Sequence, residues 1–269
     1  MTRVAIIGVT GRMGRAIVRA ASASTDITVV AGVASASSAE LGKDVGELAG
    51  VGRCGVLVTS ELPAALGTCD VAIDFSNGSV TAANVAACRA ARKPVVVGTT
   101  GFASDAELEV AEAARHIAVL VAPNTSLGVT LLIEMVRAAA RTLPAGFDIE
   151  ISEAHHRNKR DAPSGTALAL GRAAAEGRGQ AFDAVAVMSR HGEAVRQPGE
   201  IGFAVTRGGD IVGEHTVLFA GQGEQVSLGH RATDRSIFAT GALRAAAWLV
   251  GQPAGRYAMR DVLGYKTGT

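Results

Sequence analysis

The segment from Glu150 to Thr166 holds most of the side chains in this chain that could carry chemistry. It reads EISEAHHRNKRDAPSGT and joins two adjacent histidines to Lys159 through a short basic stretch. A histidine can give a proton near neutral pH, and Lys159 competes as the donor because neighbouring cations would lower its pKa. The segment therefore predicts proton transfer to a reacting centre.

The end of the same segment predicts a site for an anion. Pro163 ends the loop, and Ser164 is a favourable N-cap for a helix that continues to Ala175. Gly165 and Thr166 then offer backbone N–H groups at the helix N-terminus, where a carboxylate is stabilised. Further positive charge comes from His156, Arg157, Lys159 and Arg160. We therefore expect a small acidic substrate.

Two alternatives stay open for this basic segment. The paired histidines are candidate metal ligands, but no HExxH or similar spacing is present, and a strand would point neighbouring side chains to opposite faces. The segment could also be a solvated basic loop. We expect no metal site.

A glycine-rich turn near the start of the chain predicts dinucleotide binding. The sequence VAIIGVTGRMGRAI places Gly8, Gly11 and Gly14 between an apolar strand and a helix. The first glycine permits the tight turn, the second lets the backbone approach a pyrophosphate, and the third allows close packing of helix on strand. The helix N-terminus offers N–H groups to the phosphates, and Arg12 could add a charge contact. The spacing is GxxGxxG, and its place between strand and helix is the context that this function requires.

The residues after the second strand leave the choice between NADH and NADPH open. The acidic residue expected roughly 20 positions after the turn, which would hold the ribose of NAD, is missing. The chain reads Val33-Ala34-Ser35-Ala36 there, without an arginine for a 2′-phosphate. Ser35 and the serines after it could hydrogen-bond a phosphate or a ribose, or form a plain polar loop. We expect NADPH and/or NADH, with a slight preference for NADPH because no carboxylate would repel its additional phosphate.

Three later strands end in small polar residues that would lie at one sheet edge. The turns are Asp74-Phe75-Ser76, Gly98-Thr99-Thr100-Gly101 and Ala122-Pro123-Asn124-Thr125-Ser126. Ligands of such sheets bind beyond the carboxyl ends of the strands. Each turn alone could be an ordinary connection, but three at one edge favour a cofactor site.

The elements that position these residues alternate in the first half of the chain. Apolar strands are predicted at 4–7, 27–33, 71–75, 94–97 and 117–121, and helices at 13–21, at 79–92 and from about Ser104. Fully apolar strands alternating with helices indicate a parallel sheet covered on both faces. The fold class is α/β, with an N-terminal doubly wound Rossmann-type sheet.

The second half has a different pattern. A long helix is predicted at 127–142 and strands at 147–153, 185–189, 199–206, 211–219 and 224–230, the last three as an antiparallel meander. We expect an α+β substrate and oligomerisation domain with a mixed or antiparallel sheet. A final helix at about 234–250 should return to the first domain, and Ala173–Ala181 should be a flexible loop. The domains are then 1–126 plus 236–269, and 127–235.

Composition excludes several classes of protein. The 269 residues carry a formal net charge of +1, so no field of one sign would recruit nucleic acid or a membrane. No apolar run reaches the ~18 residues of a membrane helix, and the N-terminus does not resemble a signal peptide. Three cysteines without metal-ligand spacing (Cys54, Cys69 and Cys88) favour a reduced, cytoplasmic protein.

Taken together, these motifs resemble the dihydrodipicolinate reductase (4-hydroxy-tetrahydrodipicolinate reductase) family of lysine and diaminopimelate biosynthesis. The resemblance rests on VAIIGVTGRMG, VGTTGF, APNTSLGV, EAHHRNKRDAPSGTA and GDIVGEHTVLFA, in family order over almost the whole chain. It implies reduction of a cyclic 4-hydroxy dicarboxylate with loss of water to tetrahydrodipicolinate, by a homotetramer. Two rivals are another Rossmann-type reductase with a different acidic substrate and a non-catalytic NAD(P) sensor.

The resemblance also implies roles for individual residues. His155 would be the proton donor, Lys159 a second donor or an electrostatic partner, and His156, Gly165 and Thr166 the ligands of a substrate carboxylate. The implied cofactor contacts are Gly8, Val9, Thr10, Gly11, Arg12, Met13, Gly98, Thr99, Thr100, Ala122, Pro123, Asn124 and Thr125, to which the loop adds Ser35. This chain departs from the family at Ala34-Ser35, where members often carry an acidic–basic pair, and at Thr125, where many have an aromatic residue.

Overall fold

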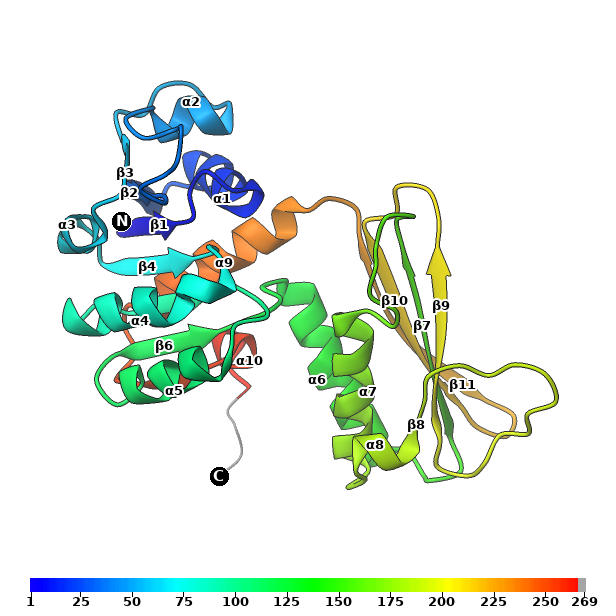
Figure 1. Cartoon of the computed structure of the whole chain (residues 1–269). Coiled ribbons are helices and arrows are strands. Elements are labelled where there is room, and N and C mark those ends of the chain that lie inside the picture. Colours follow the sequence, from blue (N-terminus) through cyan, green and yellow to red (C-terminus); the bar gives the residue numbers. More distant parts are fainter. Residues whose placement is uncertain (266–269) are drawn as a thin grey trace. The chain divides into compact units, whose positions relative to one another are not determined.

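The computed structural model describes residues 1–265. The chain divides into two compact units, which are described separately (Figure 1). Unit 1 comprises Met1–Ser126 and the chain from Ser236 onward, and unit 2 comprises Leu127–Arg235. The helix after Ser236 packs on the sheet of unit 1.

A parallel sheet forms the centre of unit 1. Within residues 1–265 it has seven strands in the order β12-β6-β5-β4-β1-β2-β3. From β1 the chain adds strands toward β3 at one edge, and from β4 it adds strands toward the other edge. Ligands of doubly wound sheets bind at such a switch point, here between β1 and β4. The register pairs Ile7 with Asp74, Asp74 with Val97 and Val97 with Val121, so these strands end at one edge. The strands are β1 (Thr2–Ile7), β2 (Ile27–Val33), β3 (Val58–Thr59), β4 (Val71–Asp74), β5 (Val95–Val97), β6 (Ala118–Val121) and β12 (Gly255–Tyr257).

Helices cover both faces of this sheet because its central strands are apolar throughout and β4 and β5 are completely buried. Leu66, Val85 and Val110 bring α3, α4 and α5 onto one face. On the other face α1 packs against α9, which also contacts β4, β5 and β6. The helices are α1 (Arg12–Ser22), α2 (Val45–Ala49), α3 (Leu62–Thr68), the 3₁₀ turn η1 (Gly78–Val80), α4 (Thr81–Ala90), α5 (Ser104–Ala113), α9 (Ser236–Leu249) and α10 (Met259–Val262).

Asp44 organises the glycine-rich loop that follows β2. It caps α2 by accepting hydrogen bonds from the N–H groups of Gly46 and Glu47, and it also accepts from those of Cys54 and Gly55. Burial alone would raise the pKa of this carboxyl, but the four N–H donors outweigh burial and lower the pKa to about 2. The loop therefore depends on an ionised Asp44.

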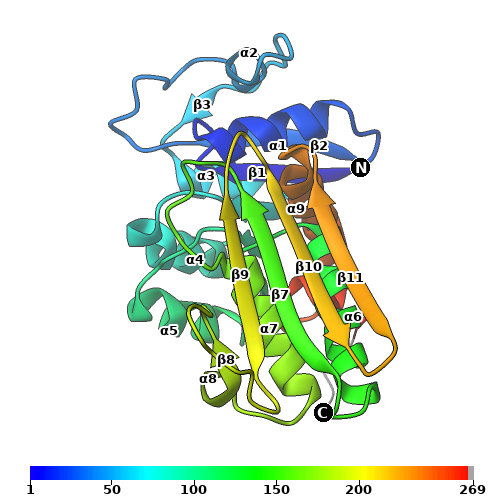
Figure 2. The ribbon, with the colours of Figure 1, turned by 90° about the vertical axis from the view of Figure 1, so that its right-hand side faces the viewer.

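Unit 2 is built on a mixed sheet. Over the part of unit 2 that the structure describes, five strands have the order β11-β10-β7-β9-β8 (Figure 2). β10 is antiparallel to both β7 and β11, whereas β9 is parallel to β7 and β8. The strands are β7 (Asp148–His155), β8 (Ala186–Val187), β9 (Ile201–Arg207), β10 (Gly213–Ala220) and β11 (Gln225–Ala232).

Two long helices cover the inner face of this sheet. Leu132 and Val136 of α6 (Leu127–Thr142) and Leu170 of α7 (Gly165–Gly177) form one core with Ile149 and Ile151 of β7, and α8 (Phe182–Val185) adds to its edge. Every second residue of β7, starting at Ile149, faces this core. The sheet thereby sets which face each site residue of β7 takes.

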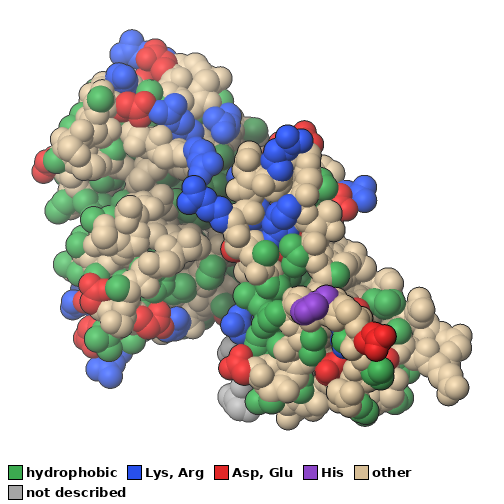
Figure 3. Space-filling view, turned by 45° about the vertical axis from the view of Figure 1, so that its right-hand side comes forward, with side chains coloured by type: hydrophobic (Ala, Val, Ile, Leu, Met, Phe, Trp, Pro, Cys, Tyr) green, Lys and Arg blue, Asp and Glu red, His purple; other side chains and the backbone are tan. Residues whose placement is uncertain are grey.

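The outer face of the same sheet is not covered by any helix of unit 2 (Figure 2). Its exposed positions include Ser152, Thr216, Ser227 and Gly229. Figure 3 shows hydrophobic side chains grouped beside a histidine on the surface of unit 2.

Two expectations for unit 2 were wrong. The three strands at 199–206, 211–219 and 224–230 do not form a meander, because β7 lies between β9 and β10 and only β10 and β11 make a hairpin. The stretch from Ala173 to Ala181 is not a flexible loop throughout, because Ala173–Ala175 are buried in the last turns of α7. Alanine favours a helix strongly enough to outweigh the neighbouring glycines.

Candidate active site

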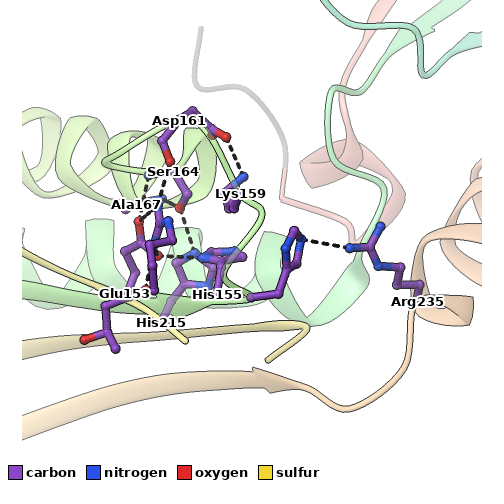
Figure 4. A network of polar contacts seen from close by, with 11 residues as sticks. Glu153, His155, Lys159, Asp161, Ser164, Ala167, His215 and Arg235 are labelled. Atoms are coloured by element: carbon purple, nitrogen blue, oxygen red, sulfur yellow. Dashed lines mark hydrogen bonds and ion pairs between the residues drawn. The ribbon is translucent and has the colours of Figure 1, made fainter. Parts of the chain in front are cut away.

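The end of β7 places Glu153 and His155 on the same face of the sheet of unit 2. Side chains two residues apart in a strand point the same way, and both of these lie on the inner face and are buried. The Nδ1 atom of His155 lies 2.5 Å from Oε2 of Glu153. The strand therefore presents an imidazole already paired with a carboxylate (Figure 4).

Two further groups hold Glu153. Arg207, at the end of β9, donates from Nη1 to Oε2 at 2.8 Å and from Nη2 to Oε1 at 2.9 Å. The backbone N–H of Ser164 donates to Oε1 at 3.0 Å. Neither Glu153 nor Arg207 was among the expected site residues. The available signal was the spacing of Glu153, which gives it the same strand face as His155.

The electrostatics of the pair follow from burial and from these donors. Burial would raise the pKa of Glu153, but the hydrogen bonds from Arg207, His155 and Ser164 hold it below its usual value. Burial lowers the pKa of His155. Glu153 acts to raise this pKa, whereas the positive charges of Lys159 and Arg207 lower it further. At neutral pH the pair is thus a carboxylate beside a neutral imidazole. A nearby dianion would favour protonation of His155.

His215 joins this cluster from β10. Its ring centroid lies 5.1 Å from that of His155, edge to face, and its Nε2 lies 3.0 Å from Oγ of Ser164. Burial lowers the pKa of His215 to about 4, and His155 adds to the effect, so this ring is neutral. The structure thus places His215 beside His155.

Lys159 and His156 lie on the loop that follows β7. Lys159 Nζ is 2.9 Å from Oδ1 of Asp161, which keeps the ammonium paired. Nε2 of His156 is 3.1 Å from Nη2 of Arg235, a residue that the sequence did not single out. Figure 4 shows Lys159 on the side of the loop that carries Asp161, and Arg235 reaching in from the chain after β11. The loop therefore brings the positive charge of Lys159 close to His155.

The helix α7 begins as expected, with Ser164 as its N-cap. Its hydroxyl accepts a hydrogen bond from the N–H of Ala167 at 3.2 Å. A Cβ added to Gly165 would meet no atom within 4 Å, so the space in front of its backbone is open. Gly165 and Thr166 occupy the first turn, and the N–H of Gly165 donates to the carboxylate of Asp161, so this helix N-terminus already holds an anionic group.

The glycine turn of unit 1 fits a pyrophosphate. Gly8 has φ of +81°, and a Cβ there would lie 2.6 Å from the carbonyl oxygen of Phe75. A Cβ on Gly14 would lie 2.4 Å from the carbonyl oxygen of Gly8, so α1 packs on the turn backbone to backbone. Gly11 caps α1 without a side-chain hydrogen bond, which leaves the first-turn N–H groups of the helix for a ligand. Arg12 is exposed at this helix start.

The turn is braced by a residue that the sequence did not suggest. Arg15 donates from Nε to the carbonyl oxygen of Thr10 at 2.9 Å and pairs with Glu40 at 2.6 Å. Ser35 lies in the exposed loop before Glu40, where its hydroxyl is 2.9 Å from that of Ser37. Ser35 is thus accessible, and Val9 is buried and can reach a ligand only through its backbone.

The ends of β4 and β5 meet at the edge beyond β1. Asp74 is fully buried; its carboxylate accepts from the N–H of Ser76 and from Asn84, and it lies 3.4 Å from Oγ1 of Thr99. Burial raises the pKa of Asp74, and these hydrogen bonds only partly oppose the shift. A Cβ on Gly98 would collide with the ring of Phe75, which explains the glycine. Asp74 thereby fixes the backbone of both turns.

A cavity opens between these two turns. Its volume is about 530 Å³, and it is lined by Ser76, Asn77, Gly78, Ser79, Thr100, Gly101 and Ala103. Thr100 was an expected cofactor contact, whereas Asn77 to Ser79 were not suggested by the sequence. Small hydroxyl and backbone groups give this cavity a polar lining.

In the third turn, residues 122–126, most side chains are buried in unit 1. Thr125 is buried, and its hydroxyl donates to the carbonyl oxygen of Phe238 at 2.6 Å. Oδ1 of Asn124 accepts from the N–H of Ser126. Ala122 is buried and Pro123 is exposed. Of this turn, Asn124 and Pro123 remain partly or fully accessible to a ligand.

Over residues 1–265, no group of three or more His, Cys, Asp or Glu side chains could hold a metal ion. None of the helices described there is long and apolar enough to cross a membrane.

Comparison with known families matches both parts of the chain. The family described as "Dihydrodipicolinate reductase, N-terminus" matches residues 2–125, and "Dihydrodipicolinate reductase, C-terminus" matches residues 128–263.

Full-length relatives agree with this match. The chain is 50% identical over 269 residues to a 4-hydroxy-tetrahydrodipicolinate reductase of Anaeromyxobacter dehalogenans (strain 2CP-1 / ATCC BAA-258), covering 100% of both chains. It is 49% identical over 265 residues to the enzyme of the same name from Thiobacillus denitrificans (strain ATCC 25259 / T1), covering 98% of this chain and 99% of the relative. A solved structure, dipicolinate-bound dihydrodipicolinate reductase from Paenisporosarcina sp. TG-14, is similar with a TM-score of 0.76 and 25% identity, covering 96% of this chain and 97% of that one.

Proposed function

Because the chain belongs to the dihydrodipicolinate reductase family, we propose that it reduces 4-hydroxy-tetrahydrodipicolinate to tetrahydrodipicolinate, with loss of water, in lysine and diaminopimelate biosynthesis. The single observation that carries the site assignment is the junction of β7 and α7. There an imidazole held by a buried carboxylate stands beside a helix N-terminus where the N–H of Gly165 already donates to a carboxylate, that of Asp161.

Unit 2 is the proposed substrate domain. The N-terminus of α7 at Gly165 and Thr166 is the proposed site of one substrate carboxylate, which would replace the Asp161 carboxylate at the N–H of Gly165, and the His156–Arg235 pair adds charge for it. Binding a dianion in this cationic loop raises the pKa of His155 toward the range needed for proton donation. The relative from Paenisporosarcina sp. TG-14, which was solved with dipicolinate bound, supports a dicarboxylate ligand.

Unit 1 is the proposed dinucleotide-binding domain. The residues that would hold a nicotinamide cofactor are the turn from Gly8 to Met13 at the pyrophosphate, Ser35 at the adenine ribose, and Gly98 to Thr100 with Ala122 to Thr125 at the nicotinamide end. A bound reduced nicotinamide supplies the hydride. NADPH is the preferred form on this proposal, because the Ser35 loop offers hydroxyls and Glu40 is engaged by Arg15.

The residues of unit 2 complete the reaction by moving a proton. His155 donates from its ring to the centre left negative by hydride addition, and Lys159, paired with Asp161, stabilises the developing charge. Burial of the His155 cluster limits competition from water.

We further propose a cytoplasmic homotetramer that binds neither nucleic acid nor membrane. The outer face of the unit 2 sheet, which no helix of unit 2 covers (Figure 2), supports self-association, because residues as small as Ser152, Ser227 and Gly229 would let a second sheet approach closely. The three cysteines are free, which supports a reducing compartment.

The test is oxidation of reduced nicotinamide by the purified protein. The substrate is generated in place from pyruvate and aspartate semialdehyde by the preceding synthase, and NADH and NADPH are compared. Synthase-dependent oxidation with a higher kcat/KM for NADPH is the expected result. Cofactor binding without oxidation would instead favour a cofactor sensor or a different acidic substrate.

A further inference from the structure

Building on the function proposed above, we propose that Glu153 and Arg207 are positioning residues that keep the proton of neutral His155 on Nδ1, so that Nε2 is the ring nitrogen that serves the substrate. Glu153 and His155 come from β7 and Arg207 from β9, so the arrangement is built into the sheet.

The hydrogen bonds around Glu153 decide which atom of His155 carries the proton. A carboxylate has about four acceptor positions. Oε2 takes His155 and Arg207, and Oε1 takes Arg207 and the N–H of Ser164. Arginine and a backbone N–H can only donate. These donors hold the pKa of Glu153 below its usual value, so the carboxyl is ionised near neutral pH and can only accept, and Nδ1 of His155 must be the donor.

The other ring nitrogen is left available. Among residues 1–265 no group hydrogen-bonds Nε2 of His155, whereas Nε2 of the neighbouring His215 is engaged by Ser164. A Cβ on Gly213 would lie 3.0 Å from Nε2 of His155. A larger residue at 213 would obstruct this nitrogen, so the glycine keeps it accessible.

Arg207 also supports the loop that carries Lys159, the second candidate proton donor. Its Nη2 donates to the carbonyl oxygen of Asp161 at 2.6 Å, and the Asp161 side chain pairs with Lys159. One guanidinium thus fixes both the carboxylate behind His155 and the loop that carries Lys159. Loss of Arg207 should disturb both groups together.

The charged and titratable groups that face His155 come from every element around it. They are Glu153 on its own strand, Arg207 on β9, His215 on β10 and Lys159 on the loop. Glu153 is the only one of these four that favours the imidazolium. Removing its charge should lower the pKa of His155 and weaken proton donation at high pH.

The first experiment reads the tautomer directly. Nitrogen NMR of the ¹⁵N-histidine-labelled protein, with His155→Gln used for assignment, reports which ring nitrogen is protonated. The expected result is a neutral ring protonated on Nδ1 in the ligand-free protein. Protonation on Nε2 would overturn the inference even if the protein reduces the substrate. A protein without reductase activity, in contrast, would refute the proposed function and leave the tautomer measurement intact.

The second experiment uses Glu153→Gln in the coupled reductase assay. We expect kcat to fall about 10–100-fold, the loss typical when the carboxylate that orients a metal-ligating histidine is removed, because Glu153 orients His155 in the same way. KM should change little, and the alkaline limb of the kcat profile should move to lower pH. A folded variant with wild-type kcat and an unchanged pH profile would overturn the inference.

Two further variants provide a control and a second test. Glu150→Gln is the matched control, because Glu150 lies on β7 but on the outer face, where it pairs with Arg190; its kcat and pH profile should match the wild type. Arg207→Lys retains the charge but loses the two parallel hydrogen bonds. If Glu153→Gln does not fold, Arg207→Lys should still lower kcat and shift the alkaline limb, and a wild-type profile there would count against the proposal.

Discussion

Replacing Gly14 by alanine should weaken cofactor binding while leaving the protein folded. The new Cβ would lie 2.4 Å from the carbonyl oxygen of Gly8 and 2.6 Å from both Cα and the carbonyl oxygen of Val9. All three atoms belong to the backbone of the turn, so no side chain can rotate away. The turn itself must move, and with it the N–H groups proposed to hold the pyrophosphate.

The size of the effect follows from two opposing contributions. Overpacking costs up to about 3 kcal/mol, and alanine recovers about 1 kcal/mol over glycine within a helix. About 2 kcal/mol of strain then remains, and the free protein relieves it by displacing the turn. Cofactor binding must restore the turn at this cost, so the Kd of the cofactor rises about 30-fold.

The assay is a titration of NADPH and NADH followed by nicotinamide fluorescence, with urea unfolding measured on the same samples. Gly67→Ala is the matched control: Gly67 lies in α3 of the same unit, is exposed, and a Cβ there would meet nothing within 4 Å. It should bind cofactor normally and gain stability. A folded Gly14→Ala protein with unchanged cofactor affinity would refute the assignment of the turn.

Two other predictions concern the anion site and the loop after β2. Gly165→Ala should leave stability unchanged or higher, since nothing lies within 4 Å of its Cβ, and should raise the Kd of dipicolinate in calorimetry; unchanged affinity would place the dicarboxylate elsewhere. Asp44→Asn should destabilise the protein at neutral pH, because the pKa of Asp44 is about 2 when folded and about 3.9 when unfolded. The stability contributed by Asp44 is complete above the unfolded pKa and is lost as pH falls toward 2, so urea midpoints of variant and wild type should converge over that range.

The sequence predicted unit 1 well because its signals are local. Strands such as Val71–Asp74 and Val95–Val97 are buried on both faces and are therefore apolar at every position. Ser164 was expected as an N-cap and caps α7. The helix α2 was missed although Asp44 caps it locally, because it has only five residues and lies among glycines that do not favour a helix.

The sequence predicted less of unit 2 because strand order and side-chain partners there depend on residues far apart. The pairing of β9 with β7 brings Arg207 beside Glu153, 54 residues away, and no local pattern signals this contact. A glutamate two residues before a histidine also looks like an ordinary polar position in the sequence. Its burial, and hence its effect on His155, emerges only once β9, β10 and α7 enclose it.

The most direct test of the account is turnover of His155→Gln with the synthase-generated substrate, together with its affinity for the reduced cofactor. The account predicts that kcat falls about 10²–10⁴-fold, the usual contribution of a general acid, while cofactor affinity is retained because His155 lies in unit 2. Turnover close to that of the wild type would contradict the central claim that His155 delivers the proton.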